Sequence, residues 1–463
     1  MSTFFGINIA LSSLLAQQRA LDTVGNNVAN VNTPGYRRQE AVLTPGPVYP
    51  PAGANGLLMG GQWGSGVEVQ MIRRAQDAYL DLHARTVHQE AAQWQSAQTA
   101  LAEVEGIIAP TSDSNLGALL DRFWNAWQDL SAHPEELSAR VNVRQQGITL
   151  CAAVRQTVAQ LRESQAGIDL TLTGKVEEIN RLAADTASLN RQIAAAQAEG
   201  RQPNDLLDQR DQALSQLADL VGITAFATDR GDVIASIGGR PLIQGSAWYG
   251  VTAATRPDGH IELRWQEDGA AVNVQGGEVF GLTQVRDSAI PGYLAQLDTL
   301  AANLVAAVNA VHQTGYGMDG STGNDFFAPG TTAANIDLSA AVLADARAVA
   351  AASTADAPGD GSLALAIAQV RDQALIGGIT LNDAFRSLMG DVANATRSAA
   401  DTVAAKQLSL QQVTTQQQSL YGVSLDEEMT NMIAYQHAYD AAARLMATMN
   451  DMLDTLINKT ASP

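Results

Sequence analysis

Apolar residues at the start of the chain recur at the spacing of a helix. Between residues 4 and 28 the repeating positions are three or four residues apart, so they lie on one face of a helix. All of these positions are apolar side chains except Gln18 and Gly25. The pattern predicts an amphipathic N-terminal helix that ends near Val31. Its apolar stripe comprises Phe4, Ile7, Leu11, Leu14, Leu21 and Val28.

The C-terminal segment repeats this pattern. From residue 425 onward apolar residues step by four and three, and Leu445 widens the stripe. Neither terminal helix has a helical neighbour next to it in sequence, so we expect the two ends to pair as a coiled-coil-like unit. The C-terminal stripe includes Leu425, Met429, Met432, Tyr439, Leu445, Met446 and Leu453.

The period of the pattern changes along the interior. Residues 32–66 are rich in Gly and Pro, which predicts extended chain and turns. Residues 75–221 are helical in pattern, in long segments rich in Ala and Gln. Residues 222–280 contain short segments separated by turn signals. Among them Ile261, Leu263 and Trp265 alternate with charged residues, as in a half-buried strand.

Helix resumes after the strands and runs to His312, then the chain turns irregular before two more helical stretches, 363–375 and 383–420. The order predicts a mainly α fold with a small inserted β domain, in an elongated, nested, multidomain architecture. We expect three domains, two of them discontinuous: 1–66 with 405–463, then 67–221 with 281–404, then 222–280.

Charge narrows the range of partners. The 463 residues include 28 Lys and Arg against 48 Asp and Glu, a net charge of −20, which disfavours nucleic acid and anionic membrane surfaces. No stretch approaches the roughly 20 apolar residues of a membrane span. The N-terminus lacks the basic segment of a signal peptide, so an exported chain needs a route without a cleaved signal.

Candidate chemistry is sparse. The single cysteine, Cys151, has no neighbouring histidine to activate it and reads as a buried, inert thiol. The six histidines show no metal-ligand spacing, and residues 318–325 fail the calcium-loop pattern and predict an ordinary turn. No nucleotide-binding or nucleophile motif is present. We therefore expect no catalytic, cofactor or metal site, and a protein that is not an enzyme.

The two amphipathic ends are the remaining candidates for function. Each stripe is broader than one partner helix can cover, and each buried Leu or Met contributes about 1.5 to 3 kcal/mol. Several copies that pack side by side would cover the rest, which predicts self-assembly through the stripes.

The segments that flank the stripes carry a family resemblance. The opening FFGINIALSSLLAQQRALDTVGNNVANVNTPGYRRQE resembles the N-terminal signature of the axial proteins of the bacterial flagellum. The close, GVSLDEEMTNMIAYQHAYDAAARLMATMNDMLDTLIN, is similar to their C-terminal signature. The resemblance adds Asn30, Asn32, Pro34, Gly35 and Tyr36 to the candidate assembly residues.

The interior selects one branch of this family. The segments LLDQRDQALSQLADLVGI, NAVHQTGYGMDGSTGNDFF and LNDAFRSLMGDV are similar to the hook-associated protein 1 family, which forms the junction between hook and filament. Only about forty residues separate Phe327 from the next helix, so we expect the chain to lack the additional β domain of better-known members.

The resemblance implies a set of partners and a location. The chain is expected to leave the cell through the flagellar type III export apparatus and to form a ring at the hook tip, as part of the extracellular flagellum. The implied partners are other copies of the chain, the hook protein, the second junction protein (hook-associated protein 3), and an export chaperone at the C-terminal helix. No cofactor, nucleic acid or membrane insertion is implied.

Three alternatives stay open. The first is that the chain is a hook or rod protein, because these proteins share the same terminal signatures. A secreted coiled-coil type III translocator would share the helical, cysteine-poor composition, but the sequence lacks its long hydrophobic hairpin. An enzyme domain inserted in a flagellar protein would need catalytic residues within 222–280, which offers only His260 and scattered carboxylates.

Overall fold

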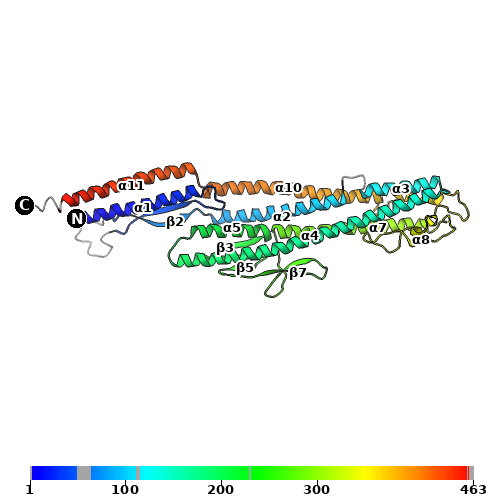
Figure 1. Cartoon of the computed structure of the whole chain (residues 1–463), viewed down its shortest axis with the longest axis horizontal. Coiled ribbons are helices and arrows are strands. Elements are labelled where there is room, and N and C mark those ends of the chain that lie inside the picture. Colours follow the sequence, from blue (N-terminus) through cyan, green and yellow to red (C-terminus); the bar gives the residue numbers. More distant parts are fainter. Residues whose placement is uncertain (1–2, 49–63, 111–114, 229–230, 456, 458–463) are drawn as a thin grey trace, which may run out of the picture. The chain divides into compact units, whose positions relative to one another are not determined.

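Long helices make up most of the structure, a computed structural model that describes residues 3–48, 64–110, 115–228, 231–455 and 457 (Figure 1). Contacts divide the chain into two units. Unit 1 comprises Met1–His88, Ile179–Gly250 and Leu408–Pro463, and unit 2 comprises Gln89–Glu178 and Val251–Gln407. The predicted mainly α fold with a small β region is confirmed.

The two terminal helices pair, as the sequence predicts. In unit 1, α1 (Thr3–Ala29) lies alongside α11 (Leu425–Asp454), although the two are at opposite ends of the chain (Figure 1). The N-cap of α11 is Ser424, whose hydroxyl accepts a hydrogen bond from the Glu427 amide. Three acidic residues in the first turn of α11 further stabilise its positive end.

A hairpin packs against α1. Strands β1 (Gln39–Pro45) and β2 (Val67–Arg74) pair antiparallel with a bulge between Val42 and Leu43, and both contact α1. Gly66 precedes β2 at φ +110°, and a Cβ there would lie 2.1 Å from Ser12 Oγ of α1. The sequence predicts only extended chain and turns for 32–66, of which 49–63 lie outside the described residues.

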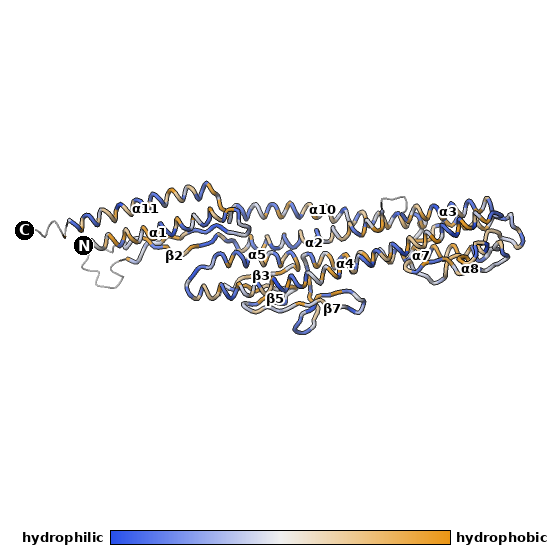
Figure 2. The backbone as a smooth tube through the Cα atoms, in the orientation of Figure 1, coloured by the Kyte–Doolittle hydropathy of each residue, from blue (hydrophilic) through white to orange (hydrophobic). Residues whose placement is uncertain are grey.

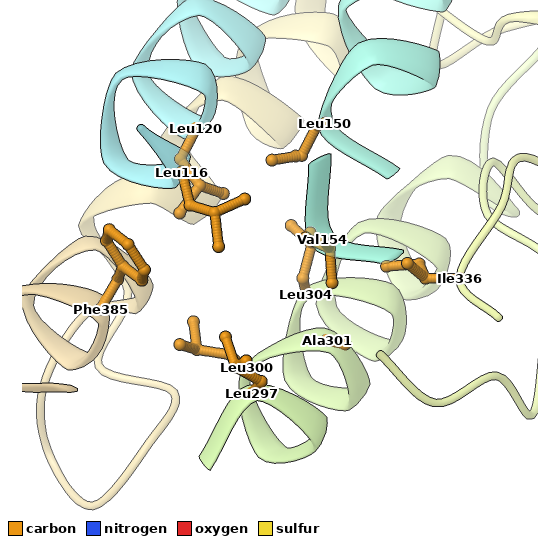
Figure 3. A pocket seen from close by; sticks show the side chains of 10 residues that line it. All are labelled: Leu116, Leu120, Leu150, Val154, Leu297, Leu300, Ala301, Leu304, Ile336 and Phe385. Carbon is orange, nitrogen blue, oxygen red and sulfur yellow. The ribbon is translucent and has the colours of Figure 1, made fainter. Parts of the chain in front are cut away.

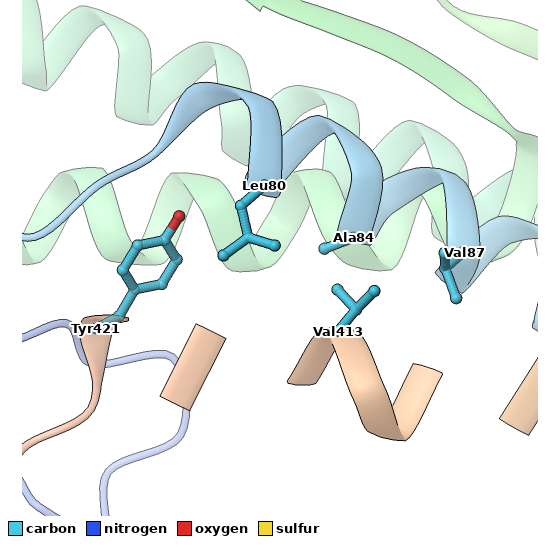
Figure 4. Close-up of a cluster of buried hydrophobic side chains, with 5 residues drawn as sticks. All are labelled: Leu80, Ala84, Val87, Val413 and Tyr421. Atoms are coloured by element: carbon cyan, nitrogen blue, oxygen red, sulfur yellow. The ribbon is translucent and has the colours of Figure 1, made fainter. Parts of the chain in front are cut away.

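The next helices of unit 1 share an apolar cluster. The start of α2 (Ala78–Ile108) packs against the end of α10 (Leu381–Tyr421). Figure 4 shows the Val413 side chain directed at α2, where Leu80, Ala84 and Val87 lie in a row. The Tyr421 hydroxyl donates to the Asp77 carbonyl and accepts from the Asp77 amide, which fixes the start of α2 against the end of α10.

A four-stranded antiparallel sheet completes unit 1. Its strands follow chain order: β3 (Ile223–Ala227), β4 (Val233–Ile237), β5 (Arg240–Gln244) and β6 (Ala247–Trp248). The buried Asn190 of α4 (Leu137–Ala198) donates to backbone carbonyls in this sheet region.

The remaining strands form a separate hairpin in unit 2. β7 (Val251–Thr255) pairs with β8 (Ile261–Trp265), whose Leu263 and Trp265 are buried as the alternation predicts. The β structure expected between 222 and 280 is therefore present, as strands β3 to β8. They form two sheets that belong to different units.

An aromatic cluster forms one part of the unit 2 core. Phe123 and Trp127 of α3 (Leu116–Ala132) contact Phe326, which also lies against His312 at the end of α7 (Ile290–His312). All four side chains are buried. This arrangement explains why the irregular segment after His312 is ordered although it contains little regular structure.

A short helix and a π-helical turn lead into α7. α6 (Gly277–Gln284) is followed by Val285–Ala289, and this whole stretch to His312 is apolar and long enough, by composition, to cross a membrane. In the structure Leu297, Ala301 and Leu304 of α7 are buried in the core of unit 2. The stretch thus departs from the sequence expectation that no segment approaches a membrane span, and it serves here as a core helix.

Apolar side chains surround a small cavity beside α7. Its volume is about 30 Å³, and side chains from α3, α4, α7 and α10 face it in Figure 3. The lining is apolar throughout, and the space is too small for a metabolite. The lining residues are Leu116, Leu120, Leu150, Val154, Leu297, Leu300, Ala301, Leu304, Ile336 and Phe385.

Short elements complete unit 2. After α7 the chain forms α8 (Ala340–Ala344) and the 3₁₀ turn Ala346–Ala348. α9 (Ser362–Ala368), which continues into the 3₁₀ turn Gln369–Asp372, packs against α3.

Candidate assembly interface

Small residues form the inner face of α1. The described positions of this helix that are fully buried are Ala10, Ala16, Ala20, Thr23, Val24 and Asn27. In the predicted stripe, Ile7, Leu14, Leu21 and Val28 lie three or four residues from a buried position and are half-buried, whereas Leu11 is exposed. α1 therefore packs within the chain through small residues flanked by half-buried larger ones, and it leaves Leu11 and Leu15 exposed.

The glycine at the N-terminal end of α1 permits a close approach to α11. A Cβ at Gly6 would lie 2.8 Å from Met449 Cε and 3.1 Å from Met449 Sδ. Such contacts require Met449 to move, because a Cβ does not approach another heavy atom so closely. Small residues on one helix and a flexible methionine on the other thus set the spacing of the pair.

Large apolar side chains remain exposed on both helices after they pair. On α1, Leu11 is 45% and Leu15 is 54% exposed; on α11, Met429 is 49% and Ile433 is 51% exposed. Figure 2 shows hydrophobic positions recurring along α1 and α11. Exposed apolar surface of this extent on a helix pair is typical of an interface with another protein.

The structure places the predicted assembly residues in three groups. Half-buried residues lie beside the α1–α11 contact: Ile7, Leu14, Leu21, Val28, Met432, Met446 and Leu453. Exposed residues lie on the outer faces: Leu11, Leu425, Met429, Tyr439 and Leu445. The side chain of Phe4 lies outside the described residues. We call the first two groups together the terminal apolar surface.

The signature residues after α1 form a hydrogen-bonded turn. The Asn30 side chain donates to the Asn26 carbonyl, and its Oδ1 accepts from the Thr33 hydroxyl at 3.1 Å. The Tyr36 amide then closes the turn by donating to the Thr33 carbonyl. Asn32 and Pro34 are exposed in this turn, so their side chains are free to meet a partner.

Gly35 and Tyr36 end the turn. Gly35 has a φ of +81°, a left-handed conformation that favours glycine. Tyr36 is half-buried, and its hydroxyl donates to Asn27 Oδ1 at 2.8 Å. Burial, together with the negative charges of Asp205, Asp208 and Glu428, raises the pKa of this hydroxyl well above its usual value. Tyr36 therefore stays a neutral hydrogen-bond donor.

Asn27 is the centre of this region. Its Nδ2 donates to the Gln39 carbonyl at 2.8 Å and to Glu428 Oε2 at 3.0 Å, and its Oδ1 accepts from the Gln39 amide at 3.0 Å. With the Tyr36 contact, every hydrogen-bonding position of the fully buried amide is used. One side chain thus connects the end of α1, the start of β1 and the start of α11.

An ion pair strengthens the same connection. Glu428, only 1% exposed, lies 2.8 Å from Arg38 Nε, and Arg38 also pairs with Glu427 at 2.8 Å. A buried carboxylate is costly unless it is paired, and here Asn27 and Arg38 together provide the partners. The charged pair fixes where along α1 the helix α11 begins.

Sequence reasoning missed Asn27, Arg38 and Glu428 as functional positions. All three lie within the family signatures, but the signatures do not show which residues contact each other. A usable signal was present: Glu428 falls at a position where the helical stripe of α11 faces its partner. A charged residue at such a position indicates a partner of opposite charge or a hydrogen-bond donor.

The described residues offer no metal centre and little chemistry. Among them no group of three or more His, Cys, Asp or Glu could hold a metal ion. Cys151 is buried, as predicted, and burial raises the pKa of its thiol to about 12. In the turn 318–325, Asp319 Oδ1 accepts from the Ser321 amide, as expected for an ordinary turn.

Comparison with known proteins gives the class of this chain. The family model described as "Flagellar hook-associated protein FlgK helical domain" matches residues 101–327. Models described as "Flagella basal body rod protein" and "Flagellar basal body rod FlgEFG protein C-terminal" match residues 7–37 and 416–459, the two segments that contain the paired helices. The chain is therefore a structural, axial component of the bacterial flagellum.

Individual relatives give the family. The flagellar hook-associated protein 1 of Bacillus subtilis (strain 168) is 31% identical over 99% of this chain and 98% of its own length. The protein of the same name from Escherichia coli (strain K12) is 27% identical, with 98% and 99% covered. This chain belongs to the flagellar hook-associated protein 1 family.

A solved structure shares the fold. "The structure of the flagellar hook junction protein FlgK from Burkholderia pseudomallei" matches with a TM-score of 0.65 at 17% identity, covering 74% of this chain and all of that one. The alignment to the E. coli relative spans 551 positions, more than the 463 residues of this chain. That relative therefore contains residues that this chain lacks.

Proposed function

We propose that this chain is the subunit that joins the hook to the filament, and that it polymerises there through the terminal apolar surface. The observation that carries the proposal is the exposure of large apolar side chains on both terminal helices after the helices have paired within the chain. Covering them requires other molecules, and neighbouring copies in a ring at the hook tip supply identical pairs.

The remaining partners follow from the same surface and from the family. The hook protein would contact the ring on one side and the second junction protein, hook-associated protein 3, on the other. The C-terminal helix offers exposed Leu425, Met429 and Leu445 to an export chaperone that binds a helix in a groove. The chain would reach the cell exterior through the flagellar type III apparatus without a cleaved signal.

The proposal also covers catalysis and the additional residues of the longer relative. The function is structural and involves no catalysis. The residues that the E. coli relative has in addition would correspond to an outer domain inserted after Phe327, so the junction here would be formed by the helical units alone.

Substitution of exposed residues on the terminal helices tests this proposal. We expect Leu11→Asp combined with Met429→Asp to leave the far-UV circular dichroism spectrum unchanged, because exposed positions alter stability by only about 0.5 kcal/mol each. Each side chain that loses burial in the assembly costs about 1.5 to 3 kcal/mol, which corresponds to about a tenfold or greater loss of affinity per contact.

The readouts are assembly and motility. In a strain that lacks the natural protein, the double variant should give hooks without filaments by electron microscopy and should release filament subunits into the medium. Leu170→Asp is the matched control, since Leu170 is 77% exposed but lies on α4, outside the terminal helices. Normal swimming by the double variant would contradict the proposal.

A further inference from the structure

Unit 1 contains a cavity of about 520 Å³ that is separate from the terminal apolar surface. It lies between the start of α2, α5 (Asn204–Val221) and β3. Three arginines line it, with two aspartates and a set of apolar side chains. The charged lining residues are Arg74, Arg85, Arg210, Asp81 and Asp211. The lining therefore carries one more positive charge than negative charges.

Guanidinium groups already engage both aspartates. Arg37 Nη2 lies 2.8 Å from Asp81 and 3.3 Å from Asp211, and Arg74 Nη2 lies 2.9 Å from Asp211. Arg74 also pairs with the buried Asp208 at 2.7 Å. The negative charge in this region is thus shared between Arg37 and Arg74, and neither Arg85 nor Arg210 forms an ion pair with a described carboxylate.

Arg85 is the less satisfied of the two remaining arginines. It forms no ion pair with any described residue, and its Nε atom is buried without a hydrogen-bond partner in the protein. Burial, the largest cause, lowers the pKa of its guanidinium, and the negative charges of Asp211 and Asp81 offset this effect only in part. A half-buried guanidinium without an ion pair is costly, because no described group replaces the water that its Nε atom has lost.

Arg210 is held by neutral groups. Its Nη1 donates to Asn190 Oδ1 at 3.1 Å and to the Gly231 carbonyl at 2.8 Å. The side chain is only 4% exposed, and its Nε has no partner in the protein. Asn190 and Gly231 therefore orient the guanidinium, and no described carboxylate lies within ion-pair distance of it.

We propose that this cavity is an anion-binding site in which Arg85 and Arg210 hold a carboxylate or an equivalent oxyanion. Two guanidinium groups that line the same cavity, one from α2 and one from α5, can each donate to an oxygen of such a ligand. The cavity is larger than a simple inorganic ion needs, and its rim includes the exposed apolar side chains Leu82 and Phe226. A carboxylate attached to a carbon skeleton fits this lining best.

Such a carboxylate has two sources. One is a free polycarboxylate in solution, and the other is an Asp or Glu side chain of a second copy of this chain, which carries 48 of them. The second source rests on the proposed self-assembly, whereas the first is independent of it. The experiment therefore measures binding and association separately.

Titration calorimetry with citrate, and with inorganic phosphate as a second probe, tests the site in the full-length chain. We expect citrate to bind, and Arg85→Gln to weaken it by about 10- to 100-fold, the usual effect of one charge-assisted hydrogen bond. Arg397→Gln removes one positive charge at an exposed position of α10 and should bind as the natural chain does. Equal binding of both probes to all three proteins, or to none, would overturn the proposal.

Thermal unfolding separates a binding role of Arg85 from a structural one. In buffer without polyvalent anions, Arg85→Gln should unfold at the same temperature as the natural chain or a few degrees higher, because it removes a half-buried charge that has no ion pair among the described residues. Citrate should then raise the unfolding temperature of the natural chain but not that of the variant. A variant that unfolds several degrees lower in both buffers would show that Arg85 only supports the fold, and would overturn the proposal.

Sedimentation velocity identifies the source. If citrate at saturating concentration weakens self-association of the natural chain, and this effect is absent from Arg85→Gln, the natural ligand is a carboxylate of a second copy. If citrate binds and association is unchanged, the site takes a free anion. Both outcomes support an anion site, and the second remains valid even if the proposed assembly through the terminal helices fails.

Discussion

Asn27 and Glu428 show how single polar side chains position the ends of this protein. They are separated by 401 residues in sequence, yet their side chains meet at 3.0 Å in a buried site. Apolar contacts alone allow two helices to slide along each other, because they have no direction. A buried amide with four hydrogen bonds has one arrangement, so it specifies the register of α1 and α11.

The amide of Asn27 gives the first residue-scale prediction. Asn27→Ala should lower the free energy of unfolding by about 2 to 3 kcal/mol, since it leaves the Gln39 backbone and the Glu428 carboxylate buried with fewer partners. Urea unfolding followed by circular dichroism measures this. Asn26→Ala, one residue earlier and exposed, should cost under about 1 kcal/mol; equal losses in the two variants would contradict the role given to Asn27.

His312 gives a prediction about pH. Its Nδ1 donates to the Asn324 carbonyl at 2.7 Å and its Nε2 accepts from the Ala350 amide at 2.9 Å, so the buried ring is neutral. Burial lowers the pKa of this ring below its usual value near 6.5. The unfolded state therefore binds the proton first as the pH falls, and this contribution to stability is present above about pH 6.5 and declines below it.

Between pH 7.5 and 5.5 we expect this single group to remove about 1 kcal/mol from the free energy of unfolding of the natural chain. His312→Gln should show a correspondingly smaller loss over the same interval. The exposed His133 is the control, and His133→Gln should keep the natural pH dependence. Urea midpoints at the two pH values test this, and identical slopes in all three proteins would exclude His312 as the titrating group.

At the scale of elements, packing in unit 2 leaves a defect that one methyl group can fill. The 30 Å³ cavity in Figure 3 is bordered by Val154 of α4. Val154→Ile adds a methylene toward this space and should stabilise the fold by about 0.5 to 1 kcal/mol. Val158→Ile places the same group one turn further along α4 at a buried position that does not border the cavity, and should destabilise by about 1 kcal/mol or more. Thermal unfolding of both variants tests whether the cavity beside Val154 accommodates the added methylene.

The helices were largely predictable from the sequence, and their packing faces were not. Unpartnered apolar stripes at both ends were enough to predict that α1 and α11 pair. The buried positions of α1 include Ala10, Ala16 and Ala20, which do not stand out in a pattern based on hydrophobicity. Small residues become informative only when the partner helix is known, because their contribution is close approach rather than buried area.

The strands show a different limit. β8 was predictable from its alternation, whereas β1 and β2 pair across a Gly- and Pro-rich segment that hides the hairpin in a local reading. The arginine-lined cavity was also beyond the sequence, since Arg85 and Arg210 are separated by more than a hundred positions and neither belongs to a motif. Ion pairs that leave one cation without a partner can be recognised only in three dimensions.

At the scale of the whole molecule, the division into two units determines what a single probe can report. Cys151 lies on the part of α4 that belongs to unit 2, where it is buried and its thiol pKa is raised to about 12. It is also the single cysteine of the chain. Its reactivity therefore follows the opening of unit 2 and is independent of the terminal helices.

We expect a thiol reagent at pH 8 to modify the native chain more than about 100-fold more slowly than the urea-unfolded chain. The Leu11→Asp and Met429→Asp variant should react as slowly as the natural chain, since its substitutions lie in unit 1. Rapid modification of the native chain would show that unit 2 opens readily. Rates measured at increasing urea concentration give the free energy of that opening.

The alanine face of α1 has a consequence for the time course of polymer growth. Alanine side chains gain little from burial and most of the larger apolar side chains of the pair are at most half-buried, so a single α1–α11 pair gains less from apolar burial than an assembly of several pairs. The larger gain comes only when a neighbour covers Leu11, Leu15 and Met429. We therefore expect the first few subunits to associate slowly and later ones to add rapidly, with a lag phase and a critical concentration. Growth would then start where a preformed template already presents the first neighbour.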